Sequence, residues 1–183
     1  HNSPRRQRQM CIRDSYISMG EGAELLADEL NISREEQEEF SFSSHEKAVA
    51  ARDAGKFDNE IVPITLEDGT IIDQDSGPRN PDKEKIKSLN PAFRADGTVT
   101  AATSSPFSIG ASAMLITSEN FANKHGLKIR AFIEGRAVAG VNWKMFGSGP
   151  VPATKKALEK TGLSIADIDA LELNEAFAAQ ALY

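Results

Sequence analysis

The sequence lacks the features that mark several large classes of protein. It holds one cysteine, Cys11, in 183 residues, so no disulfide can form within the chain, which fits a reducing compartment. Its net charge of -6 differs from the basic excess expected of a nucleic-acid-binding surface. No run approaches the roughly 20 apolar residues of a membrane-spanning helix, and no apolar signal segment begins the sequence. We expect a soluble intracellular protein with no membrane span and no nucleic-acid partner.

Motifs for common cofactors and metals are also missing. The chain has neither G-x-x-x-x-G-K-[ST] nor G-x-G-x-x-G, the glycine-rich loops that cradle nucleotide phosphates. In GASAM, Met114 stands where the nucleophile elbow of many hydrolases has glycine. His45 and His125 have no cysteine or carboxylate at ligand spacing, and we interpret both as ordinary surface helix residues. We expect neither a metal site nor a bound cofactor.

The first fifteen residues, HNSPRRQRQMCIRDS, differ in character from the rest of the chain. They hold four arginines and one aspartate, whereas the remainder is acidic. A targeting peptide or a nucleic-acid-binding arm has such a composition. The abrupt change favours a non-native or disordered tail at residues 1–15, in which Cys11 is incidental. We leave this tail out of the fold prediction.

Helix and strand patterns alternate along the rest of the chain. In GEGAELLADEL, apolar residues at i, i+3, i+4 and i+7 predict a helix with Ala23, Leu26, Ala27 and Leu30 on its buried face. The capping-box spacing of Ser33 and Glu36 predicts a second helix that ends near Gly55. Further helices are predicted at 83–89, 118–125, 152–161 and 175–182, short strands at 60–64 and 70–73, and longer strand regions at 98–101, 111–117, 130–141 and 170–173. This order indicates an α/β sheet preceded by an α-rich excursion.

Two polar segments follow predicted strands, where open α/β sheets usually bind ligands. Asn174 comes directly after the strand predicted at 170–173, and the turn TSSPFS at 103–108 comes after the strand predicted at 98–101. Asn174 also has a simpler interpretation, because asparagine is a good N-cap for the helix predicted to follow it. On the local pattern alone, capping is the commoner role.

A collinear series of motifs resembles the thiolase family. NEAFAAQ at 174–180 resembles its NEAFA signature, and MGEGAE at 19–24 resembles its MG-x-TAE stretch. The segments that continue the resemblance in the family's order are SREEQEEF, GKFDNEIVPI, LNPAF, DGTVTAATSSPFSIGASAML and GSGPVPA. The match covers roughly residues 16–183, and the likeness is to 3-ketoacyl-CoA and acetyl-CoA acyltransferases.

The resemblance implies a partial thiolase-like layered αβα fold with an inserted α-rich loop domain. By this resemblance, residues 16–97 form the loop domain, residues 98–145 end the N-terminal core domain, and residues 146–183 begin the C-terminal core domain. The family's nucleophilic cysteine lies upstream of the matched region, and its catalytic histidine and second cysteine lie downstream. The chain therefore resembles an internal fragment, which we expect to be inactive when isolated.

The resemblance also implies a reaction and the residues that serve it. Thiolases cleave 3-ketoacyl-CoA to acetyl-CoA and a shortened acyl-CoA through a cysteine acyl-enzyme, or run the reverse condensation. Coenzyme A is then a substrate, and no cofactor is needed. By the same resemblance, Asn174 would hold the water of an oxyanion hole, Ser105 would contact the pantetheine arm of CoA, Met19 would line the acyl pocket, and Arg79 would lie near the nucleotide end of CoA.

The resemblance further implies acyl-CoA and CoA as partners and a full-length homodimer or homotetramer. The location would be cytoplasmic in a bacterium, and mitochondrial or peroxisomal in a eukaryote. The chain departs from the family at Ala102, Ile109 and Phe146, and in the segment DSGPR, where the family has D-E-x-x-R. Two alternatives stay open: a non-catalytic thiolase-like protein that binds acyl-CoA or lipid, and a structural α/β subunit that serves as a scaffold.

Overall fold

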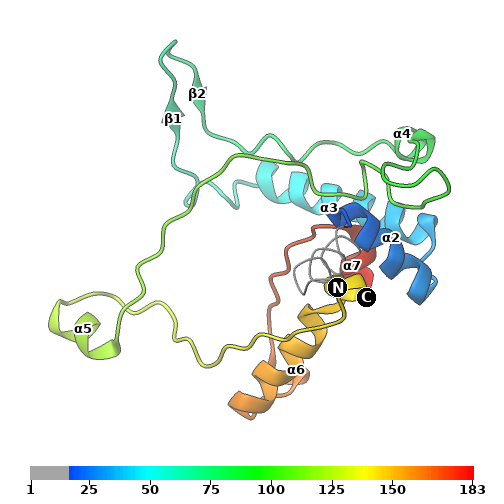
Figure 1. Cartoon of the computed structure of the whole chain (residues 1–183). Helices are drawn as coiled ribbons and strands as arrows, with labels where there is room; N and C mark the ends of the chain where they lie inside the picture. Colours follow the sequence, from blue (N-terminus) through cyan, green and yellow to red (C-terminus); the bar gives the residue numbers. More distant parts are fainter. Residues whose placement is uncertain (1–16) are drawn as a thin grey trace, which may run out of the picture. The chain divides into compact units, whose positions relative to one another are not determined.

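The computed structural model describes residues 17–183 (Figure 1). These residues form two compact units: residues 17–106, 142–148 and 173–183 make the first, and residues 107–141 and 149–172 make the second. The tail predicted at residues 1–15 lies outside the described residues. All four candidate site residues belong to the first unit.

The two longest helices of the first unit begin at capping boxes, of which the sequence predicts the second. Helix α2 spans Met19–Leu30 and α3 spans Arg34–Asp53, and each follows a serine in a complete capping box. At α3, Ser33 Oγ accepts a hydrogen bond from the Glu36 amide at 3.2 Å, and the Glu36 carboxylate accepts one from the Ser33 amide at 2.8 Å. The bonds that the Ser33 amide and the Ser33 hydroxyl donate to the carboxylate stabilise its ionised form and lower the pKa of Glu36. The predicted start of the second helix is confirmed.

The core of the first unit forms where α2 packs against α7, Ala178–Leu182, and against the 3-10 helix η1, Trp143–Ser148. Ala23, Leu26 and Ala27 of the predicted apolar face are buried, whereas Leu30 is 37% exposed. Helix α3 also packs against α7, and Figure 1 shows α2, α3 and α7 gathered together. Burial of this apolar face holds the three helices in place.

The paired strands are shorter and fewer than the sequence predicts. Strands β1, Ile64–Thr65, and β2, Ile71–Ile72, form an antiparallel hairpin near the two predicted short strands. The longer strand predictions are wrong in residues 17–183, because the segments 98–101, 111–117, 130–141 and 170–173 form no strand there. A strand needs a neighbour to satisfy its backbone amides and carbonyls, and apolar content alone supplies none. Met114 is 86% exposed, so the 111–117 segment is not buried either.

The second unit contains two α-helices with the predicted caps. Helix α5, Glu119–Lys124, follows Ser118, whose Oγ accepts a hydrogen bond from the Phe121 amide at 3.2 Å. Helix α6, Pro150–Thr161, begins two residues before the predicted start and ends at Gly162, whose φ of 71° favours glycine. A short 3-10 helix, η2, spans Ile165–Asp167.

Helix α6 holds part of the extended segment of its own unit. Lys156 Nζ donates a hydrogen bond to the Val138 carbonyl at 3.4 Å, and Lys160 Nζ donates one to the Arg136 carbonyl at 3.3 Å. None of the helices in residues 17–183 is both long and apolar enough to cross a bilayer.

Candidate functional site

The structure brings the Ser105 turn and the NEAF segment side by side. The Ser105 amide donates a hydrogen bond to the Ala176 carbonyl at 2.8 Å, and the Ala178 amide donates one to the Thr103 carbonyl at 2.9 Å. Between these bonds, Ser104 and Phe177 form an antiparallel bridge. Ser105 and Asn174 therefore lie on two backbone segments that are fixed to each other, although 69 residues separate them in the sequence.

Asn174 is exposed and does not cap the helix that follows it. Helix α7 begins at Ala178, and its N-cap position is Phe177, which makes no side-chain cap hydrogen bond. The simpler interpretation of Asn174 as an N-cap is therefore wrong. The Asn174 carbonyl instead accepts a hydrogen bond from the Ala176 amide at 2.9 Å, which turns the backbone ahead of the helix.

Phe177 anchors the start of α7 by packing. Its ring meets the ring of Phe93 edge to face, with the centroids 6.0 Å apart and the planes at 75°. Phe93 follows α4, Lys83–Ser88, in the chain, so this contact joins the α4 region to the NEAF segment.

A charged cluster surrounds the residue after Asn174. The Ser44 hydroxyl of α3 donates a hydrogen bond to the Glu175 carboxylate. Burial and the positive charge of Arg79 lower the pKa of the neighbouring His45, and the Glu175 carboxylate opposes that shift. His45 is half-buried on α3. The charge of Arg79 thus acts on His45 of α3, the residue next to the Ser44 that binds Glu175.

The position of Arg79 depends on a contact one residue earlier. Arg52 of α3 donates a hydrogen bond from Nη1 to the Pro78 carbonyl at 3.1 Å, which ties this loop to the helix.

Met19 is the first residue of α2 and is 60% exposed. Ser105 and Asn174 are joined through hydrogen-bonded segments, and Arg79 lies close enough to His45 of α3 to lower the pKa of that side chain.

Comparison with known proteins identifies the family. The model of the thiolase N-terminal domain matches residues 5–120, and that of the thiolase C-terminal domain matches residues 127–183. The chain belongs to the thiolase family. The predicted resemblance is confirmed by these matches.

Named relatives of the chain are acyltransferases of this family. A 3-ketoacyl-CoA thiolase of Vibrio parahaemolyticus is 53% identical over 170 residues, which cover 90% of this chain and 44% of the relative. An acetyl-CoA acetyltransferase of Paracoccus denitrificans is 45% identical over 168 residues, which cover 90% of this chain and 43% of the relative. The chain thus spans less than half the length of the curated relatives it matches.

Solved thiolase structures share its fold. An acetyl-CoA acetyltransferase of Bacillus anthracis matches with a TM-score of 0.88 at 45% identity, covering 91% of this chain and 43% of that one. Human mitochondrial 3-ketoacyl-CoA thiolase matches with a TM-score of 0.87 at 41% identity and the same coverage. The predicted fold class, a partial thiolase-like α/β fold, is confirmed.

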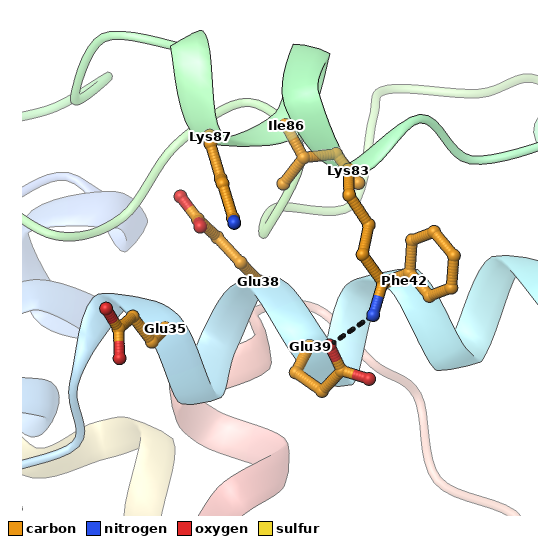
Figure 2. A pocket seen from close by; sticks show the side chains of 7 residues that line it. All are labelled: Glu35, Glu38, Glu39, Phe42, Lys83, Ile86 and Lys87. Carbon is orange, nitrogen blue, oxygen red and sulfur yellow. Dashed lines mark hydrogen bonds and ion pairs between the residues drawn. The ribbon is translucent and has the colours of Figure 1, made fainter.

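A separate cavity of about 370 Å³ lies between α3 and α4 of this thiolase segment (Figure 2). Lys83 lies across one end, where its Nζ is 3.0 Å from a Glu39 carboxylate oxygen and 4.4 Å from the centroid of the Phe42 ring. None of the four candidate residues lines this cavity. Within residues 17–183, no group of three His, Asp or Glu side chains is placed to hold a metal ion. We therefore leave this cavity out of the candidate site.

Two residues that contact the segments of the candidate site have only weak sequence signals. Glu24 is fully buried on α2 and binds the backbone at Thr98 and Val99. The sequence feature that could have identified Glu24 is its position three residues before Ala27, which puts a carboxylate on the buried face of the helix. Ser44 lies in a polar run of α3, and nothing in that run distinguishes it from its neighbours.

Proposed function

We propose that the complete protein containing this chain is an acyltransferase that cleaves 3-ketoacyl-CoA by thiolysis, or catalyses the reverse condensation. The observation that carries this proposal is the pairing of the Ser105 turn with the NEAF segment, in a chain 53% identical to a 3-ketoacyl-CoA thiolase. That pairing supports a shared site for Ser105 and Asn174, because hydrogen bonds join their two backbone segments.

The chemistry assigns a role to each candidate. The acyl group passes from the substrate to a cysteine and then to coenzyme A, so each half-reaction develops negative charge on a carbonyl oxygen. The Asn174 amide holds a water that donates to this oxyanion. Ser105 contacts the pantetheine arm, Met19 lines the acyl pocket, and Arg79 lies near the nucleotide end of CoA. Coenzyme A acts as a substrate, and the reaction needs no other cofactor.

The catalytic cysteine and histidine belong to other parts of the complete protein. Residues 17–183 contain no cysteine, and the arginine-rich context of Cys11 differs from the one that the resemblance implies for the nucleophile. We therefore propose that the 183-residue chain alone does not cleave acetoacetyl-CoA. In the complete protein, residues 16–97 act as the loop domain, residues 98–145 end the first core domain, and residues 146–183 begin the second. Assembly is as a homodimer or homotetramer.

The test is CoA-dependent cleavage of acetoacetyl-CoA by the complete protein and its variants. Loss of one oxyanion donor typically lowers kcat by about 100- to 1,000-fold, and we expect a fall of that order for Asn174→Ala. Ser105→Ala is expected to raise KM for coenzyme A with a smaller change in kcat. Asn120→Ala on α5, an exposed change, is the matched control for Asn174→Ala and should behave as wild type.

Three outcomes would overturn the proposal. Wild-type complete protein that binds acyl-CoA without cleaving it would instead be a non-catalytic acyl-CoA carrier. Protein that folds but does not bind CoA would be a scaffold. Cleavage by the 183-residue chain itself would contradict the assignment of the nucleophile to another part of the protein.

A further inference from the structure

Glu24 is a carboxylate with no exposure to solvent, held on the inner face of α2. Burying a charge is costly unless hydrogen bonds compensate for the lost water. Glu24 Oε2 accepts a hydrogen bond from the Thr98 amide at 2.9 Å, and Oε1 accepts one from the Val99 amide at 3.1 Å. Arg94 Nη2 lies 3.6 Å from Oε2. The two oxygens of one carboxylate thus bind two consecutive backbone amides.

Gly97 makes this approach possible. A Cβ at position 97 would overlap the Glu24 carboxylate, so a larger residue could not bring the Thr98 and Val99 amides as close. Hydrogen bonds with a charged acceptor are stronger than neutral ones, which suits a contact that must fix the backbone.

A second helix holds the same threonine. Gln37, fully buried on α3, donates from Nε2 to Thr98 Oγ1 at 3.0 Å, and Thr98 Oγ1 in turn lies 3.3 Å from Glu24 Oε2. The next two residues, Val99 and Thr100, are fully buried. The backbone from Thr98 to Thr100 is therefore held by side chains of both α2 and α3.

Hydrogen bonds continue from this anchored backbone into the candidate site. The Thr100 amide donates to Thr103 Oγ1 at 2.9 Å, and the Thr103 carbonyl accepts from the Ala178 amide at 2.9 Å. The Ser105 amide donates to the Ala176 carbonyl at 2.8 Å, and the Ala176 amide donates to the Asn174 carbonyl at 2.9 Å. Glu24 has no hydrogen bond to Ser105 or Asn174. Hydrogen bonds joined by short stretches of backbone nevertheless lead from its carboxylate to both residues.

We propose that Glu24 is a positioning residue for acyl transfer: its buried carboxylate sets the Ser105 turn, and through that turn the backbone that carries Asn174. This inference rests on the proposed function for its kinetic consequence. Its physical basis, the hydrogen-bonded series from Glu24 to Ala178, can be measured without any activity.

The experiment compares Glu24→Gln with two control variants in the complete protein. Glutamine keeps the size of the side chain but puts an NH2 donor opposite one of the two backbone N–H donors. Glu29→Gln, an exposed change on the same helix, controls for the lost charge, and Leu26→Val controls for lost stability. Thr98→Val removes only the bridging hydroxyl and serves as the milder variant where Glu24→Gln does not fold.

Kinetics with acetoacetyl-CoA and coenzyme A give the first readout. We expect Glu24→Gln to raise KM for coenzyme A roughly tenfold and to lower kcat by a similar factor, because the small displacement affects both Ser105 and Asn174. A merely destabilised enzyme loses folded molecules, which lowers the apparent kcat but leaves KM unchanged. A Glu24→Gln variant with unchanged KM, or one that matches Leu26→Val, would overturn the proposal.

Amide hydrogen exchange gives a second readout that does not depend on activity. We expect Glu24→Gln, or Thr98→Val to a smaller degree, to lose protection at Ser105 and at Ala178 as well as at Val99. Loss confined to residues 98 and 99 would show that the series transmits nothing, and the proposal would fail. If the wild-type protein has no thiolase activity, the proposed function fails, and hydrogen exchange alone decides whether Glu24 positions the two segments.

Discussion

Replacing Leu26 by alanine should be among the most damaging apolar changes in the first unit. Leu26 is 1% exposed, the lowest of the apolar residues on α2. The Leu26 side chain packs against η1 at Gly147. A Cβ added to Gly147 would lie only 3.1 Å from Leu26 Cδ2. Ala23 and Ala27 flank it on the same buried face. These small neighbours have no side-chain length with which to fill the space that alanine would leave.

The size of the loss follows from this packing. Leucine-to-alanine changes in protein cores cost about 2 to 5 kcal/mol, and the cost is greater where the cavity cannot collapse. We therefore expect Leu26→Ala to lower the free energy of unfolding by about 3 to 4 kcal/mol. Leu30→Ala is the matched control, because Leu30 is on the same helix but 37% exposed. It should cost roughly half as much or less, since much of its side chain already meets water.

Trp143 provides the assay for this pair of variants. It is the only tryptophan in the chain and begins η1, which packs against α2. With a urea m-value of about 1 to 3 kcal/mol/M, a loss of about 3 kcal/mol lowers the midpoint of the fluorescence transition by roughly 1 to 3 M. Equal losses in both variants would refute the packing argument. A Trp143 transition unaffected by Leu26→Ala would show that α2 and η1 do not share a core.

Three further predictions test other local features of the chain. Ser33→Ala removes the cap of α3 and should cost about 1 kcal/mol in chemical denaturation, and no measurable loss would contradict the capping role. Gly97→Ala should destabilise the fold far more than Gly77→Ala, because a Cβ at 97 meets a buried carboxylate and one at 77 meets nothing within 4 Å; equal denaturation midpoints would contradict this. The lowered pKa of His45 means that the unfolded chain binds more protons, so stability should fall as the pH drops from about 6.5 through the folded pKa. His45→Gln should lose less stability over that range in denaturation titrations, and identical pH profiles would refute the assignment.

The helices were predictable because their signals are local. A capping box joins residues three apart, and the apolar face of α2 repeats within a single helix. The sequence therefore predicts where α3 and α5 begin and that α6 ends at Thr161. Motifs in family order also indicated the thiolase family, which the comparisons confirmed.

The strand errors have a physical cause that no local pattern contains. An apolar run favours an extended backbone, but pairing depends on whether another segment lies beside it. Residues 111–117 and 130–141 have no such partner in residues 17–183, so they are extended without forming a ladder. The hairpin of β1 and β2 forms because its partner lies a few residues away across a tight turn.

The sequence by itself determined most of the helices, the cap of α3, the family and the choice of candidate residues, since each depends on neighbouring residues or on motif order. Only the tertiary structure decided that Asn174 is not a helix cap and that its segment is bound to the Ser105 turn. It also decided that Glu24 binds an amide 74 residues away. Such contacts join positions far apart in the chain, and only the packing of α2, α3 and α7 brings them within hydrogen-bonding distance.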